Sequence, residues 1–127
     1  MKYGYKKKIS HSFAEAVEKV KSELSKEGFG VLTKIDVKAT LKKKLNVEYD
    51  NYLILGACNP PFALEALKAE RDIGLLLPCN VIVYEDGGRV FVSAILPTVA
   101  MEMVESPSHA AIAAEVEKKL KRVIDSV

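Results

Sequence analysis

The sequence predicts an α+β fold with two layers, in which a sheet of about five strands carries helices mainly on one face. The chain has 127 residues, of which 49% are hydrophobic and 28% are charged, and these values suit one globular domain spanning residues 1–127. Apolar runs of strand length alternate with segments of helical periodicity until a hairpin signal places two strands in succession.

The first half of the chain predicts two strands, each followed by a helix. Lys2–Ile9 has the lysines of an edge strand, and Gly30–Ile35 is the second strand. Ser12 and Glu15 have the spacing of a capping box, in which each side chain binds a backbone N–H at the helix start. Asp36 is placed to cap a short, lysine-rich helix.

A buried strand and a third helix meet near the middle of the chain. Tyr52–Ala57 is apolar throughout, which is typical of a strand covered on both faces. Asn59 suits the N-cap of the next helix, and proline suits its first turn, where the missing N–H costs nothing. This helix extends to about Glu70.

The last third of the chain predicts a hairpin and a long helix. Asp86-Gly87-Gly88 lies between two apolar runs, as in a tight turn between neighbouring strands. Ser106-Pro107 begins the final helix. Its apolar residues recur at helical spacing and predict a buried face made of Ile112, Val116, Leu120 and Val123.

Composition and motifs exclude several classes of function. The net charge is +2, which is too small to indicate binding to nucleic acid. The first residues lack the apolar core of a signal peptide, and no apolar run is long enough to span a bilayer. We therefore expect a cytoplasmic protein without membrane contact. No phosphate loop, nucleophile elbow or histidine-based metal motif is present, so we expect no cofactor and no metal.

The residues most able to carry a site lie at the turn Cys58-Asn59-Pro60. A helix N-terminus offers unpaired N–H groups, here assigned to Phe62 and Ala63, and a partial positive charge. Such a place can bind an anion and can lower the pKa of a nearby thiol. The main hypothesis is therefore a binding or assembly module with a pocket for a small ligand or an anion, lined by Cys58, Asn59, Phe62, Ala63 and Cys79.

Two further hypotheses depend on the cysteines. Cys58 would serve a thiol enzyme or redox protein as the reactive thiol, with Cys79 as its partner, although no general base accompanies them. The same two residues would alternatively bind a soft metal ion, with Met101 and Met103 as possible neighbours. Their spacing fits neither a redox CxxC motif nor a zinc knuckle, and the sequence leaves their mutual distance open.

Several of these segments together resemble a known family. The segments are Gly28–Leu32, Ile35–Val37, Leu55–Pro60 and Ile73–Val81, and the similarity extends from about Tyr3 to the C-terminus. The chain is similar to the family called domain of unknown function 302. The resemblance implies a small α+β fold that is usually dimeric and has no assigned activity.

The apolar runs predict a homodimer independently of that resemblance. Tyr52–Ala57, Ile73–Leu77, Val81–Tyr84 and Val90–Leu96 lack clean polar alternation, so both faces of several strands need cover. A two-fold contact is the commonest way to bury such a surface. We expect either a face of the sheet or the Met101–Val104 segment to lie in the contact.

Overall fold

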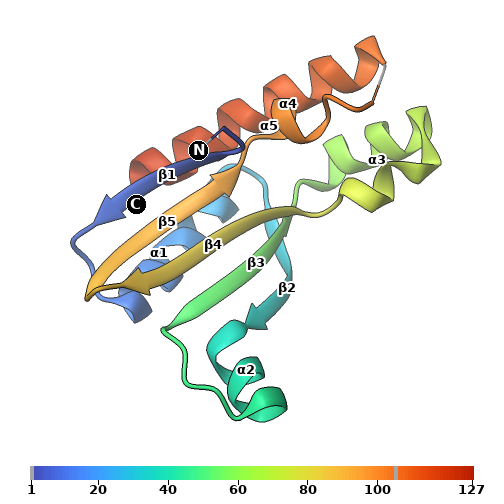
Figure 1. The fold of residues 1–127 in the computed structure, drawn as a ribbon. Helices are drawn as coiled ribbons and strands as arrows, with labels where there is room; N and C mark the ends of the chain where they lie inside the picture. The colour runs from blue at the N-terminus through green and yellow to red at the C-terminus, as the bar shows by residue number, and fades with distance from the viewer. Residues whose placement is uncertain (1, 105) are drawn as a thin grey trace.

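The computed structural model describes residues 2–104 and 106–127 and contains one five-stranded antiparallel sheet (Figure 1). Its strand order is β1-β5-β4-β3-β2, an order that the sequence had left open. The strands are β1 (Gly4–Ile9), β2 (Gly30–Asp36), β3 (Tyr52–Cys58), β4 (Cys79–Asp86) and β5 (Arg89–Ile95). The helices are α1 (Phe13–Lys26), α2 (Val37–Leu45), α3 (Pro60–Ala69), the 3-10 helix η1 (Arg71–Leu76), α4 (Pro97–Ala100) and α5 (Pro107–Ser126).

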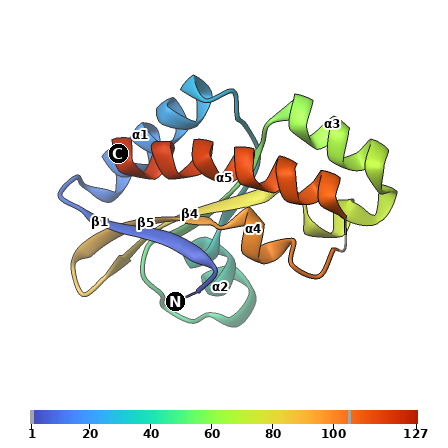
Figure 2. The same cartoon turned by 90° about the horizontal axis from the view of Figure 1, so that it is seen from above.

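The longest helices, α1 and α5, pack side by side on one face of the sheet (Figure 2). Helix α3 packs against α5 beyond the end of the strands, and α2 lies apart from both at the β2–β3 end of the sheet (Figure 1). The predicted α+β fold of two layers is confirmed. Two short elements, η1 and α4, were not predicted.

The predicted local signals form the starts of α1 and α2. The N–H of Glu15 donates to Ser12 Oγ at 3.2 Å, and the N–H of Ser12 donates to Glu15 Oε1 at 3.3 Å, which completes the capping box. Asp36 Oδ1 accepts the N–H of Ala39 at 2.9 Å and caps α2. Both caps use residues within three positions of each other, so sequence spacing alone determines them.

The hairpin between β4 and β5 turns at two glycines. Gly87 and Gly88 have φ values of +58° and +78°, the left-handed pair that a type I′ turn requires. This turn matches the natural twist of the two strands and sets Asp86 opposite Arg89. The predicted hairpin is confirmed, and its register follows from the turn.

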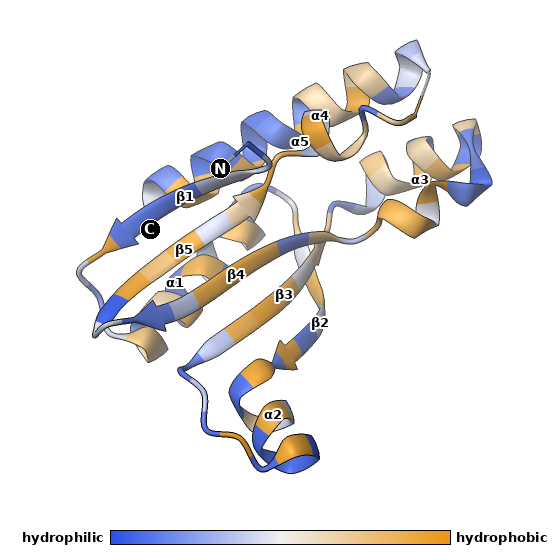
Figure 3. Cartoon of the chain, in the orientation of Figure 1, coloured by the Kyte–Doolittle hydropathy of each residue, from blue (hydrophilic) through white to orange (hydrophobic). Residues whose placement is uncertain are grey.

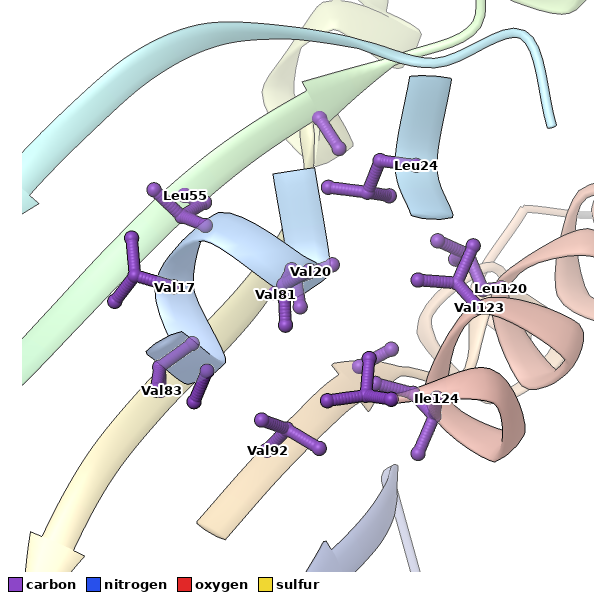
Figure 4. Packing of buried hydrophobic residues seen from close by; sticks show 14 of the residues in the cluster. Val17, Val20, Leu24, Leu55, Val81, Val83, Val92, Leu120, Val123 and Ile124 are labelled. Atoms are coloured by element: carbon purple, nitrogen blue, oxygen red, sulfur yellow. The ribbon is translucent and has the colours of Figure 1, made fainter. Parts of the chain in front are cut away.

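The core lies between the sheet and the pair α1 and α5 (Figure 4). Alternate residues of β3, β4 and β5 face these helices and are buried, because successive side chains of a strand point to opposite faces. Figure 4 shows side chains of both helices meeting those of the strands. The largest fully buried aliphatic residues there are Leu24, Leu55, Leu120, Ile124, Val20, Val81, Val83, Val92 and Val123.

Strand β1 forms one edge of the sheet, as its lysines predict, and its side chains donate hydrogen bonds to residues 125 and 127. Lys7 Nζ donates to the carbonyls of Asp125 and Val127, each at 3.0 Å. The hydroxyl of Tyr5 donates to the Asp125 carboxylate at 2.8 Å. The pairing of β1 with β5 sets Gly4 opposite Ile95.

Neither α1 nor α5 lies over the opposite face of the sheet (Figure 2), and this face carries a row of aromatic side chains. Tyr84 stacks between Tyr52 and Phe91, with ring centroids 5.3 and 5.2 Å away, and Lys6 Nζ lies 5.0 Å from the Phe91 ring. The expectation that Tyr52–Ala57 is covered on both faces is wrong in part, because Tyr52 and Ile54 on this side are only half-buried. We name this surface, with its aromatic row, the open sheet face.

Figure 3 shows apolar residues along much of β3, β4 and β5, which follows from their position in the middle of the sheet. Their neighbours on both sides complete their backbone hydrogen bonds. The two edge strands contain more polar residues. The open sheet face is therefore apolar mainly where β3, β4 and β5 form it.

Candidate functional site

A small cavity lies where the end of β3 turns into α3, with a volume of about 40 Å³. The start of β4, helix α4 and the first turns of α5 complete its walls. All five residues predicted for a site line it, although Cys79 is more than 20 positions from the turn in the sequence. They are Cys58, Asn59, Phe62, Ala63 and Cys79.

The rest of the lining is almost entirely apolar. Ala66 from α3, Met101 after α4, and Ile112, Ala113 and Val116 from α5 contribute to the walls. Helix α5 reaches the cavity because the same face that packs on the sheet continues past the ends of the strands. The final helix therefore serves the core with its last turns and the cavity with its first.

Asn59 occupies the N-cap position of α3, but its side chain does not cap the helix. Its Nδ2 instead donates to the carbonyl oxygen of Glu27, at the end of α1, at 3.2 Å. Only 8% of Asn59 is exposed. The expected side-chain cap is wrong because this contact between distant segments turns the amide away from the α3 backbone.

The expectation of two free N–H groups in the first turn of α3 is also wrong. Pro60 and Pro61 have no N–H, and the N–H of Ala63 donates to the carbonyl oxygen of Asn59 at 3.0 Å. Ala63 is the fourth helical residue and so the first to find a partner inside the helix. The Phe62 N–H is then the only donor of this turn without a helical partner.

The two cysteines come from neighbouring strands. Cys79 stands opposite Ala57 in the register of β3 and β4, so Cys58 is one residue beyond the residue that faces Cys79. Both thiols are free and half-buried. Burial first, and then the neighbouring Cys58, raises the pKa of the Cys79 thiol to about 11. Cys79 is thus protonated near neutral pH.

The positions of the predicted metal ligands support the metal hypothesis only in part. Cys58, Cys79 and Met101 line the same cavity, whereas Met103 is 75% exposed and absent from its lining. Within the described residues, no three His, Cys, Asp or Glu side chains are close enough to hold an ion together. A four-coordinate zinc site would need such a group.

His109 is a cavity residue that the sequence did not assign to the site. It lies in the first turn of α5, and only 2% of it is exposed. Its Nε2 lies 3.1 Å from the carbonyl oxygen of Ala66 in α3. A single histidine near a helix start is usually exposed to solvent, and nothing nearby in the sequence shows that α3 covers this one.

The Arg71–Leu76 segment forms η1 and returns the chain from α3 to β4. This return places Cys79 beside the β3–α3 turn instead of at the far end of the sheet.

In the described part of the chain, no helix is long and apolar enough to cross a membrane.

Three curated proteins are similar to part of the chain. Two of them are fluoride-specific ion channels, FluC 1 of Brucella suis biovar 1 and FluC 1 of Brucella abortus biovar 1, each 33% identical over 85 residues. Each match covers 65% of this chain but only 33% and 31% of the respective channel protein. The chain thus spans about a third of the length of the curated relatives it matches.

A solved structure is similar over nearly the whole chain. It is the crystal structure of an uncharacterized conserved protein, DUF302, from Bacillus stearothermophilus, with a TM-score of 0.92 and 31% sequence identity. The similarity covers 99% of this chain and 98% of that one. The sequence model of the family "Domain of unknown function DUF302" also matches residues 5–127. The chain therefore belongs to the DUF302 family, whose function is unknown.

Proposed function

We propose that this chain is a homodimeric binding module that holds a small uncharged ligand in the cavity beside Cys58-Asn59-Pro60. The observation that carries the proposal is the convergence of all five predicted residues on one apolar-lined cavity. Ligand sites are typically concave, mostly apolar and supplied with a few polar groups. Here the polar groups come from Asn59, His109 and the two thiols.

The charge of the ligand follows from the donors that the site offers. An anion at a helix N-terminus needs several converging N–H groups. The two prolines and the Asn59–Ala63 hydrogen bond leave the Phe62 N–H alone. Burial of a charge without paired partners is costly, so an uncharged ligand suits the cavity better than an anion.

Binding also fits Cys79 better than catalysis does. A nucleophilic cysteine reacts as the thiolate, and the high pKa of Cys79 keeps that thiol protonated near neutral pH. We therefore favour a binding role for Cys79 over the role of resolving thiol in a redox pair.

A cavity-filling variant tests the binding proposal. Uncharged molecules of about three to five non-hydrogen atoms are titrated into methyl-labelled protein, and the shifts of the Met101, Ile112 and Val116 methyl groups are followed by NMR. Ala63→Leu extends a side chain into the cavity and should abolish saturable shifts. Ala39→Leu adds the same volume at an exposed position of α2 and should leave them unchanged. Non-saturable shifts in the unmodified protein would refute the proposed pocket.

We place the dimer contact on the open sheet face. Neither α1 nor α5 covers its half-buried apolar residues, which include Ile54, Ile82 and Tyr84. The Met101–Val104 segment is the other candidate, since Met103 is 75% exposed. Large exposed apolar patches usually mark contact surfaces.

Light scattering of variants decides between these two surfaces. We expect about twice the chain mass of 14.0 kDa. Ile82→Lys should halve the measured mass if the open sheet face forms the contact, and Met103→Lys should do so if the Met101–Val104 segment does. Ala14→Lys, at an exposed position of α1, is the control. A mass of one chain that stays constant on dilution would end the dimer proposal.

The similarity to fluoride channels favours a second candidate, a ligand-sensing domain that works with an ion channel. The chain matches about a third of those proteins, and its described residues include no helix able to cross a membrane. On this proposal the chain would sense a small molecule and would not form a pore. Titration with sodium fluoride followed by ¹⁹F NMR separates direct recognition of the ion from sensing of another ligand. Saturable broadening of the fluoride signal would contradict the preference for an uncharged ligand.

A further inference from the structure

His109 has a buried nitrogen that the fold does not use. The residue is third in α5 after Ser106, and its ring forms part of the cavity wall. Nδ1 is buried, and within residues 2–104 and 106–127 no group forms a hydrogen bond with it. Buried polar atoms without a partner are rare in native proteins, and each calls for an explanation.

The partner of Nε2 determines the chemical character of Nδ1. A backbone carbonyl oxygen only accepts hydrogen bonds, so Nε2 must carry the hydrogen that it donates to Ala66. In the neutral imidazole, Nδ1 is then an acceptor with a free lone pair. The missing partner of this nitrogen is therefore a hydrogen-bond donor.

The surroundings of His109 are almost entirely apolar. Among the described residues that line the cavity there is no carboxylate, and those with titratable side chains are His109, Cys58 and Cys79. His109 thus lines an apolar cavity and has a buried acceptor nitrogen without a partner among the described residues.

We propose that His109 selects the ligand: the cavity binds a small uncharged molecule whose hydroxyl or thiol donates a hydrogen bond to His109 Nδ1. This inference rests on the proposed binding function and adds the class of ligand to it. A site with an unsatisfied buried acceptor discriminates against molecules that cannot supply the donor, because the acceptor then stays unpaired.

The volume of about 40 Å³ limits the ligand to a few non-hydrogen atoms. A matched pair of probes of this size is 2-propanol and acetone. Both have four non-hydrogen atoms in the same branched arrangement, but only 2-propanol carries a hydrogen-bond donor. Their difference in affinity therefore measures the contribution of the donor with little change in size.

The experiment titrates both probes into protein with ¹⁵N-labelled histidine and methyl-labelled cavity residues. Methyl shifts give the two dissociation constants, and the ¹⁵N signal of His109 Nδ1 reports whether the lone pair accepts a hydrogen. We expect 2-propanol to bind about five- to tenfold more tightly than acetone, as one hydrogen bond to a buried acceptor implies. The Nδ1 signal should move with 2-propanol and stay in place with acetone.

Two substitutions separate this role from a structural one. His109→Gln retains a donor for the Ala66 carbonyl and an acceptor for the ligand, so it should keep the preference for 2-propanol. His109→Phe retains a ring without either group and should lose the preference. If both probes bind the unmodified protein equally and Nδ1 does not respond, the inference is wrong while the pocket stands. If neither probe binds saturably, both this inference and a pocket of this size are refuted. Because the ¹⁵N readout uses the unmodified protein, it decides even if a variant fails to fold.

Discussion

Replacing Asn59 by aspartate should destabilise the fold more than replacing it by alanine. A side chain that caps α3 would tolerate aspartate, because aspartate is among the best N-cap residues. The observed contact demands the opposite, since Asn59 Nδ2 donates to the Glu27 carbonyl and a carboxylate has no hydrogen to donate. The two interpretations of Asn59 therefore predict opposite orders of stability.

The expected size follows from the atoms involved. Asn59→Ala removes one partly buried hydrogen bond, a loss of about 1 kcal/mol and at most about 2 kcal/mol. Asn59→Asp removes the same bond and also sets a carboxylate against a carbonyl oxygen at the negative end of α1. The positive end of the α3 dipole would stabilise this carboxylate by only about 0.3–1 kcal/mol. We expect a net loss of about 2–3 kcal/mol for Asn59→Asp, the larger of the two.

Urea unfolding of both variants at several pH values measures the difference. The introduced carboxyl should have a pKa above its unfolded value of about 4, because its charged form is disfavoured in the fold. An acid of this kind binds more protons in the folded state, so the deficit grows as the pH rises through the folded pKa. Below about pH 4 the carboxyl is protonated and can donate to Glu27, and the deficit should shrink to that of Asn59→Ala or less.

Asn80→Asp is the matched control, because it makes the same change at an exposed position of β4. It should change the free energy of unfolding by less than about 0.5 kcal/mol. If Asn59→Asp is as stable as the unmodified protein at pH 7 while Asn59→Ala is not, Asn59 acts as a cap and the contact with Glu27 contributes little.

Three further predictions follow from packing and titration. Leu120→Ala should lower the free energy of unfolding by about 2–4 kcal/mol in urea titrations, because Leu120 is 1% exposed; a loss under about 0.5 kcal/mol would contradict the packing of α5. Gly56→Ala should destabilise by about 1–3 kcal/mol, because the new methyl group would collide with Thr33 Oγ1 and lie 2.8 Å from Pro78 Cγ; partial recovery in the double variant with Thr33→Ala checks the cause. Cys79 should react with iodoacetamide in the folded protein only as the pH approaches 11, as measured by mass spectrometry; alkylation at pH 8 as fast as in urea would contradict its raised pKa.

The parts of the fold that the sequence predicted are those set by nearby residues. Ser12 and Glu15 form their capping box across one helical turn, and Gly87 and Gly88 close a hairpin between adjacent strands. The strand order could not be predicted in this way. The pairing of β1 with β5 joins residues that no local pattern connects.

In the candidate site, too, local sequence patterns did not predict the contacts between distant segments. Its location was predictable, because a helix start after an apolar strand is visible in the sequence at Asn59-Pro60. The partners of its polar groups were not, because Asn59 binds the carbonyl of Glu27 and His109 binds that of Ala66. Both contacts cross between helices, so they depend on how α1, α3 and α5 are arranged and not on residue spacing.

The place of β1 in the sheet has a consequence for synthesis of the chain. A ribosome delivers this strand before β5, its one strand neighbour among the described residues, which follows some 80 residues later, and the carbonyls that accept from Lys7 come later still. During that interval the strand lacks its pairing and is open to association with other chains. Its consecutive lysines, Lys6, Lys7 and Lys8, keep such a strand soluble by mutual repulsion until β5 emerges. The charge at this edge thus protects the nascent chain before it has a fold to stabilise.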